Sequence, residues 1–216
     1  MRIIPEDYVD EVKSYLKNLR DDVKVIIFTQ KYRCSGCREA EDLCADLSEL
    51  SNKILLEKYV YEFNRDRFNE YNVTYVPTMI IVSPHTGGMA RFLGVPLGYE
   101  FMSLLEDIIH ASTGEFELPK SLINSVLGIK SKVNLKVFVT LTCPYCPIAV
   151  RIAHDFSLMN PMISGEMIDS SLFPNLALKY SVSAVPKTII NDVLDIVGAF
   201  PPDLLLKRIY EALERH

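Results

Sequence analysis

Four of the chain's five cysteines stand in two pairs of the same spacing, and this spacing is typical of thiol chemistry. Cys34 and Cys37 enclose Ser-Gly, whereas Cys143 and Cys146 enclose Pro-Tyr. At a helix start, one turn of spacing keeps an exposed thiol beside a second thiol that can resolve a mixed disulfide. The unpaired N–H groups and partial positive charge of a helix start also favour a thiolate. We therefore predict Cys34 and Cys143 as nucleophiles and Cys37 and Cys146 as resolving thiols.

Other uses of cysteine pairs stay open beside this one. A zinc ion shared by the two pairs is disfavoured, because 105 residues separate Cys37 from Cys143, whereas zinc ribbons separate their pairs by roughly 15 to 20 residues. We expect no metal. One pair could instead be a structural disulfide, and this alternative is stronger for Cys34 and Cys37 than for Cys143 and Cys146. The lone Cys44 is interpreted as a small core hydrophobe.

The two pairs belong to an internal repeat. Cys143 lies 109 residues after Cys34. The same offset relates five further pairs of identical residues: Cys37 and Cys146, Tyr71 and Tyr180, Val73 and Val182, Val76 and Val185, Pro77 and Pro186. Six positions that share one offset predict two copies of one structural unit.

Each copy shows the same order of elements. Apolar runs predict a strand before each cysteine pair, a helix after it, a second strand, a short helix, a Val-Pro step, a hairpin and a closing helix. The predicted strands cover 23–28, 54–63, 78–82 and 89–93 in the first copy and 135–140, 162–168, 188–190 and 193–197 in the second. The core-facing stripes of the predicted helices are Leu43, Leu47 and Leu50; Ile148, Ile152 and Phe156; Leu104, Leu105, Ile108 and Ile109; Leu205, Leu206, Ile209 and Leu213.

This order predicts an α/β protein of two tandem units, each with a mixed central sheet flanked by helices. Ser, Thr, Gly and Pro interrupt the pattern over 112–120 and predict a linker there. We place the first unit at 1–117 and the second at 118–216.

The two Val-Pro steps extend the candidate sites. A proline directly before a central strand is tolerated where no ladder hydrogen bond is needed, and a cis peptide suits such a tight entry. We predict cis bonds at Val76-Pro77 and Val185-Pro186. The backbone beside each bond could then pair with an extended substrate segment, without demanding a particular sequence.

Three segments carry a resemblance to a known family. They are Cys-Pro-Tyr-Cys-Pro-Ile-Ala-Val-Arg-Ile-Ala-His at 143–154, Tyr-Ser-Val-Ser-Ala-Val-Pro-Lys at 180–187, and Phe-Leu-Gly-Val-Pro-Leu-Gly at 92–98, which leads into Glu100. Each unit resembles a thioredoxin fold, and the tandem resembles the protein disulfide oxidoreductases of hyperthermophilic archaea and bacteria. The resemblance implies dithiol-disulfide exchange at both cysteine pairs, which would oxidise, reduce or isomerise disulfides. It also implies protein thiols and disulfides as substrates, a thioredoxin reductase as a candidate partner, and no cofactor.

The chain departs from this pattern at several positions. Ser35-Gly36 replaces the bulkier dipeptide expected at the first site, whereas Pro144-Tyr145 resembles glutaredoxin. Thioredoxin carries a buried Asp six residues before its first cysteine, and Phe28 and Val137 stand at those positions here.

Five basic side chains lie near the sites in the sequence, and Lys187 and His154 among them have more ordinary interpretations as well. Lys31, Arg33 and Arg38 place cations near Cys34. Lys187 lies either near the second site or on a solvent-facing strand. His154 is interpreted as a solvated or hydrogen-bonded helix residue rather than a catalytic base.

Charge and composition exclude other classes of function. The chain has 23 Lys and Arg against 28 Asp and Glu, a net charge of −5, and no basic stripe, which disfavours nucleic acid as a partner. No apolar run approaches the roughly 20 residues needed to cross a bilayer, and the N-terminus lacks the apolar region of a signal peptide. We expect a cytoplasmic protein without a membrane partner. Two alternatives to protein disulfide exchange stay open: a glutaredoxin-like or peroxide-linked electron relay, and a non-catalytic thioredoxin-fold module that binds peptides.

Overall fold

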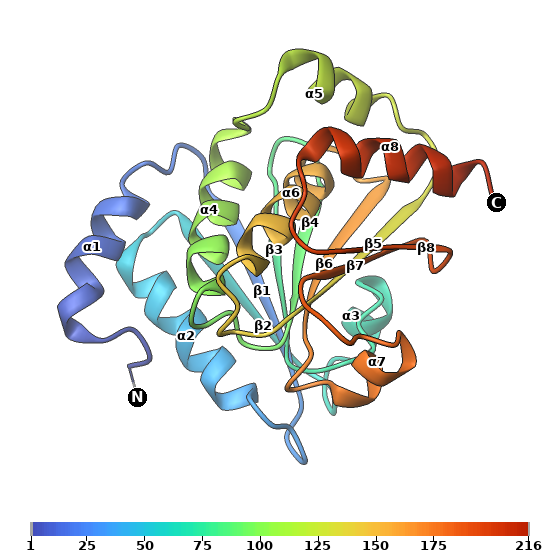
Figure 1. The fold of residues 1–216 in the computed structure, drawn as a ribbon. Helices are drawn as coiled ribbons and strands as arrows, with labels where there is room; N and C mark the ends of the chain where they lie inside the picture. The colour runs from blue at the N-terminus through green and yellow to red at the C-terminus, as the bar shows by residue number, and fades with distance from the viewer. Residues whose placement is uncertain (1, 216) are drawn as a thin grey trace.

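One mixed sheet of eight strands runs through the whole molecule, and helices lie on both of its faces (Figure 1). The computed structural model describes residues 2–215. The strand order is β2-β1-β3-β4-β6-β5-β7-β8. The strands are β1 (Val23–Thr29), β2 (Ile54–Val60), β3 (Thr78–Val82), β4 (Met89–Leu93), β5 (Val133–Val139), β6 (Ile163–Asp169), β7 (Lys187–Ile190) and β8 (Leu194–Val197). The helices are α1 (Glu6–Leu16), α2 (Cys37–Leu50), α3 (Arg65–Glu70), α4 (Glu100–Thr113), α5 (Lys120–Leu127), α6 (Cys146–Met159), α7 (Pro174–Lys179) and α8 (Pro202–Leu213).

The two predicted units are present, and they occur in sequence order. The hairpin turn of the second unit is as expected, with Asn191 and Asp192 both at positive φ, 51° and 59°, as a two-residue turn of this kind requires. Helices α1 and α5, which precede the first strand of each unit, were not predicted. Each buries only two side chains along its length, so the apolar stripe is too short to detect. The predicted boundary between 117 and 118 falls in the connection from α4 to α5 and stays a prediction.

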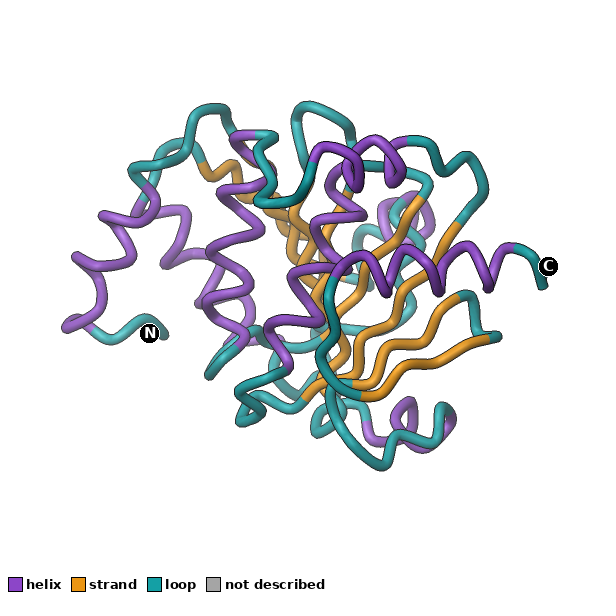
Figure 2. The backbone as a smooth tube through the Cα atoms, turned by 45° about the horizontal axis from the view of Figure 1, so that its top comes forward, coloured by secondary structure: helices purple, strands orange, loops and turns teal. Residues whose placement is uncertain are grey.

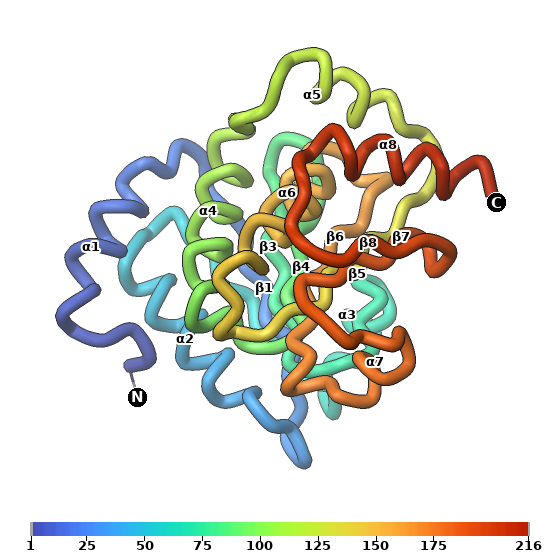
Figure 3. Tube along the Cα trace, in the orientation of Figure 1, coloured from blue at the N-terminus to red at the C-terminus, as the bar shows by residue number. Residues whose placement is uncertain are grey.

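The two units do not keep separate sheets. Strand β4 of the first unit pairs in parallel with β6 of the second, from Ala90 opposite Gly165 to Leu93 opposite Ile168. The tandem of thioredoxin-like units is therefore confirmed, but their sheets join edge to edge into one. Figure 3 shows the two halves of the chain side by side along this sheet.

The two faces of the sheet are covered unequally. One large core lies on the face that carries α1, α2, α4, α5, α6 and α8, and it is continuous across both units. On the opposite face, two small cores lie under the short helices α3 and α7. Alternation along β1 explains this division, because Val25 and Ile27 join the large core while Ile26 and Phe28 join a small one. Figure 2 shows how much of the helical structure lies over one face.

No helix within residues 2–215 has the length and apolar character needed to cross a bilayer.

Helices α4 and α6 pack against each other at the boundary between the units. Two histidine-aspartate pairs join them. The Nδ1 atom of His154 lies 2.6 Å from an oxygen of Asp107, and that of His110 lies 2.7 Å from an oxygen of Asp155. Because each pair takes one residue from each helix, both pairs tie the first unit to the second.

One predicted core position is wrong. The side chain of Ile148 on α6 is 41% exposed. The buried face of this helix instead includes Ala149, Ile152, Ala153 and Phe156. Ile148 lies in the first turn of α6, on the face of the helix that is open to solvent.

Strand directions place both cysteine pairs at the same end of the sheet, the end at which β1 and β5 finish. Strands β1 and β5 point the same way, because β4 is parallel to β6 and each unit repeats the same internal pairing. Four strand steps separate β1 from β5 in the sheet order, a distance of about 19 Å at the usual strand spacing. The pairs therefore cannot share one tetrahedral zinc ion, whose ligand sulfurs lie about 2.3 Å from the metal.

The close contact between the units generates a stability prediction. A β-carbon on Gly88 would lie 2.2 Å from the Ser157 carbonyl oxygen on α6, whereas one on Gly87 would have nothing within 4 Å. We expect Gly88→Ala to lower the free energy of unfolding by about 3 kcal/mol, because the backbone of α6 would have to move. Gly87→Ala should cost about 1 to 2 kcal/mol, for its positive φ alone. Urea unfolding measures both, and an equal loss in the two variants would contradict the packing described.

Candidate active site

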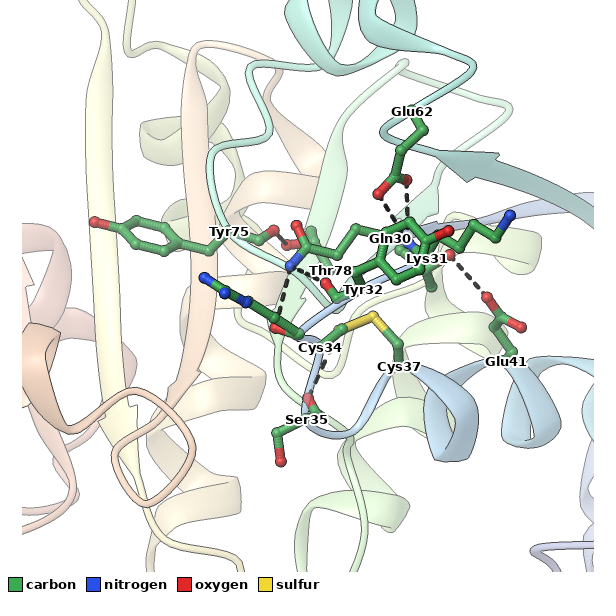
Figure 4. The surroundings of a disulfide bond; sticks show 12 residues. Gln30, Lys31, Tyr32, Cys34, Ser35, Cys37, Glu41, Glu62, Tyr75 and Thr78 are labelled. Carbon is green, nitrogen blue, oxygen red and sulfur yellow. Dashed lines mark hydrogen bonds between the residues drawn. A yellow bond between two sulfur atoms is a disulfide. The ribbon is translucent and has the colours of Figure 1, made fainter.

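The first cysteine pair lies at the start of α2. Gly36, at φ 83°, forms the N-terminal boundary of the helix, and Cys37 is its first residue. Cys34 and Cys37 form a disulfide with Cα atoms 5.6 Å apart. Figure 4 shows this disulfide at the end of the helix, with the hydroxyl of Ser35 turned away from the sulfur atoms. Cys34 is half-buried and Cys37 is buried, so the predicted nucleophile is the more accessible residue of the pair.

Hydrogen bonds hold the segment that leads into this pair. The backbone N–H of Lys31 donates to the Glu62 carboxylate at 3.0 Å, and the Thr29 hydroxyl donates to Glu41 at 2.7 Å. Glu41 also pairs with Lys58 at 2.6 Å. The side chain of Lys31 is exposed and lies over the Tyr32 ring at 5.4 Å from its centroid. Arg33 and Arg38 are exposed as well, and Arg38 pairs with Asp42 at 3.9 Å.

The second pair opens α6 in the same way. Cys146 is the first residue of the helix and is buried, whereas Cys143 is half-buried. The Cys143 thiol donates to the backbone oxygen of Val185 at 3.9 Å. Burial, together with the hydrogen bond with Cys143, raises the pKa of the Cys146 thiol. The geometry is that of an accessible first thiol backed by a second thiol that stays protonated until a base removes its proton.

The two Val-Pro steps lie where the sequence predicts them. Both Val76-Pro77 and Val185-Pro186 are cis. The carbonyl oxygens of Pro77 and Pro186 accept from Gly94 and Gly198 at 3.0 and 2.8 Å, inside the hairpins. Within residues 2–215, no hydrogen bond takes up the backbone N–H of Val76 or Val185. These two N–H groups remain available to a bound segment.

Glu100 is a site residue that was not predicted. It is the first residue of α4 and is completely buried, with one carboxylate oxygen accepting from Ser103 at 2.9 Å and the other without a partner. The preceding segment touches the second site, since the Tyr99 N–H donates to Leu141 at 3.1 Å. The charge of Glu100 is also among the causes that raise the pKa of Cys146. Burial, opposed by the bond from Ser103, raises the pKa of Glu100 itself to about 7.

Helical spacing could have identified this glutamate. Glu100 stands four residues before Leu104 and eight before Ile108, so the apolar stripe places it on the buried face. A carboxylate buried without a full set of partners is costly and therefore indicates a function.

Three other side chains have clear positions. Lys187 is buried rather than solvent-facing, and its ammonium group donates to the carbonyls of Tyr180 and Ser181 and pairs with Asp195. His154 is buried and hydrogen-bonded, as described above for its pair with Asp107. Cys44 is a buried core residue, as expected, and burial raises the pKa of its thiol.

Comparisons with known proteins agree with this arrangement. A family model described as a thioredoxin domain matches residues 133–211. The structure of a protein disulfide oxidoreductase from Aeropyrum pernix superposes with a TM-score of 0.93 at 30% identity, covering 100% of this chain and 96% of that one. The NTD_N/C domain of alkylhydroperoxide reductase AhpF from Enterococcus faecalis shares the fold, with a TM-score of 0.87 at 24% identity over 95% of this chain and 99% of that one.

Among curated proteins, the AhpF subunit of alkyl hydroperoxide reductase from Escherichia coli is 28% identical over 183 residues, which is 84% of this chain and 32% of that protein. The chain thus spans about a third of the length of the curated relatives it matches.

The burial of the three free thiols predicts an order of reactivity. After reduction of all disulfides at neutral pH, iodoacetamide should modify Cys143 well before Cys146 or Cys44, because the last two are buried and have raised thiol pKa values. Mass spectrometry of tryptic peptides measures the order. In denaturant the three rates should converge, and modification of Cys146 ahead of Cys143 in the folded protein would reverse the assignment.

Proposed function

The chain belongs to the protein disulfide oxidoreductase family, and from this membership we propose that it exchanges dithiols and disulfides with protein substrates at both CxxC sites. One observation carries the proposal for this chain. Each cysteine pair opens a helix at the same sheet edge, and each unit presents the free backbone N–H of a cis Val-Pro step. An extended substrate segment that pairs with Val185 would bring its sulfur beside Cys143, whose thiol already contacts the Val185 oxygen.

The exchange at the second site runs in two displacements. The Cys143 thiolate attacks one sulfur of a substrate disulfide, which forms a mixed disulfide and releases the other substrate sulfur as a thiolate that takes up a proton. The Cys146 thiolate then attacks the Cys143 sulfur and releases the second substrate sulfur. The substrate gains two electrons and the Cys143-Cys146 dithiol becomes a disulfide. Oxidation of a substrate dithiol is the reverse sequence.

Glu100 supplies the base for the second displacement. The raised thiol pKa of Cys146 means that its proton must be removed as it attacks. Glu100 has a pKa of about 7, is buried near this thiol and has one oxygen without a hydrogen-bond partner. It therefore takes the place of the buried aspartate that thioredoxin carries and that Phe28 and Val137 do not provide. Because Glu100 lies on α4, the first unit would complete the chemistry of the second.

The likeness to the AhpF subunit of alkyl hydroperoxide reductase favours a second candidate function. In that role the chain would pass electrons from a reductase, such as a thioredoxin reductase, to a peroxide-reducing partner rather than to protein disulfides. Reduction assays with glutathione, and with a peroxidase as electron acceptor, separate this relay from protein disulfide exchange.

We expect the second site to carry most of the activity on protein disulfides. Cys143→Ser should remove most of the insulin reduction by dithiothreitol, whereas Cys34→Ser should retain most of it. Cys146→Ser is the matched variant, and it should accumulate mixed disulfides through Cys143, because the resolving thiol is gone. Turbidity measures the first effect and non-reducing electrophoresis the second. Undiminished insulin reduction by Cys143→Ser would refute the assignment.

We expect Glu100→Gln to change the pH dependence of the second site. In the parent, the rate of substrate release from the Cys143 mixed disulfide should rise as Glu100 loses its proton through pH values near 7. Gln cannot accept that proton, so this rise should disappear and the rate above that pH should fall by about 100-fold. Stopped-flow kinetics of pre-formed mixed disulfides measures the rate of substrate release, in a Cys34→Ser/Cys37→Ser background.

The stability of the same variant provides a control. The raised pKa of Glu100 means that the folded state holds this proton more tightly than the unfolded state. The contribution of Glu100 to stability is therefore fully present below the unfolded value near 4.5 and is lost as the pH rises to about 7. Glu100→Gln should match the parent in mild acid and be more stable than the parent above neutral pH. If a lower rate came with lower stability at every pH, damage to the fold would explain it instead.

A further inference from the structure

The end of β6 and the loop that follows it to α7, residues 169–173 of the second unit, lie between the two cysteine pairs. Strand β6 stands between β4 and β5 in the sheet, so this loop leaves the sheet at the edge that carries both sites. On one side, the Ser170 N–H donates to the Val139 oxygen, next to the second site, at 2.9 Å. The Asp169 side chain fixes the turn by accepting from the Ser171 N–H at 2.9 Å.

On its other side, the loop contacts the first site. A β-carbon on Gly36, inside the first CxxC motif, would lie 3.4 Å from the Leu172 Cδ2 atom and 3.1 Å from Val95. The ring of Phe173 meets the ring of Tyr75 edge to face, with centroids 5.9 Å apart. Tyr75 directly precedes the Val-Pro step of the first unit. A side chain of the second unit therefore lies beside the dipeptide of the first site.

The equivalent side of the second site is open. Gly94 and Gly198 hold equivalent places, since each donates its N–H to the carbonyl of the Val-Pro proline in its own unit. A β-carbon on Gly94 would lie 3.0 Å from Asp169 and 3.7 Å from Leu172, whereas one on Gly198 would have nothing within 4 Å. The sheet order explains the difference, because β6 follows the first hairpin and no strand follows the second.

We propose that Leu172 of the second unit determines the specificity of the first site. Together with Val95 and the Phe173-Tyr75 contact, it narrows the approach to Cys34 so that this site accepts small disulfides or slender extended segments. The second site, with an exposed Pro-Tyr dipeptide and nothing within 4 Å of a β-carbon at Gly198, accepts disulfides in bulky polypeptides. This inference rests on the proposed exchange function. A larger residue at position 36 would meet Val95 and Leu172, in addition to the strain that the φ of 83° would impose on any residue other than glycine.

The test uses the full chain with Cys143→Ser/Cys146→Ser, so that only the first site reacts. The pre-reduced protein is mixed with insulin or with hydroxyethyl disulfide, and oxidation of Cys34 and Cys37 is followed in a single turnover by alkylation and mass spectrometry. Leu172→Ala should raise the ratio of the insulin rate to the hydroxyethyl disulfide rate about tenfold, the order of effect expected when a hydrophobic pocket changes by a few methylenes. Leu172→Val, which keeps more of the packing, should give a smaller rise in the same direction.

Phe63→Ala is the matched control. Phe63 lies 109 residues before Leu172, in the corresponding loop of the first unit, and its side chain is 73% exposed. The ratio of the insulin rate to the hydroxyethyl disulfide rate in Phe63→Ala should equal that of the parent. An unchanged ratio in both Leu172 variants, or an equal rise in Phe63→Ala, would overturn the proposal. Failure of the parent to react even with hydroxyethyl disulfide would instead contradict the proposed exchange function of the first site.

Discussion

The parallel pairing of β4 with β6 is the constraint on which the rest of the arrangement depends. It joins two four-stranded sheets in the same orientation, so both cysteine pairs lie at the same end of the strands. It also brings α4 against α6, which allows a continuous core and two histidine-aspartate pairs across the boundary. A different pairing of the same units would keep every motif and lose each of these contacts.

The two sites are therefore shared between the units. The first unit contributes Glu100 to the surroundings of Cys146, and the second contributes Leu172 to the surroundings of Gly36. In the proposed function these contributions differ in kind, since Glu100 would transfer a proton and Leu172 would restrict access. Two copies of one fold have become unlike sites without a change in the spacing of their cysteines or of their Val-Pro steps.

Features encoded within one unit could be predicted from the sequence. The repeat, the cysteine pairs at helix starts, the cis bonds at Pro77 and Pro186, and the Asn191-Asp192 turn all depend on local residue types. The joining of the sheets could not, because β4 and β8 have similar apolar patterns although only β4 finds a partner beyond its hairpin. Leu172 was missed for the same reason: its neighbour Gly36 lies in the other unit. Ile148 was wrongly predicted to be buried, because helical periodicity gives the spacing of the apolar residues but not the helical turn at which the core begins.

The join between the units is heterologous, since β4 and β6 present different edges, and such contacts form a ring if the rotation closes and an open filament if it does not. The free edge of β8 is the counterpart of the β4 edge, and β2 is the counterpart of β6, so the two outer strands offer a second molecule the same kind of pairing. The chain carries features that oppose this. The second hairpin lacks the 83–88 loop through which Thr86 contacts Leu158, and β8 has only four residues. Lys58 on β2 stands 109 residues before the buried Met167 of β6, so docking that edge would bury an ammonium group now paired with Glu41. The sequence that extends the sheet once thus carries features that oppose its growth beyond eight strands.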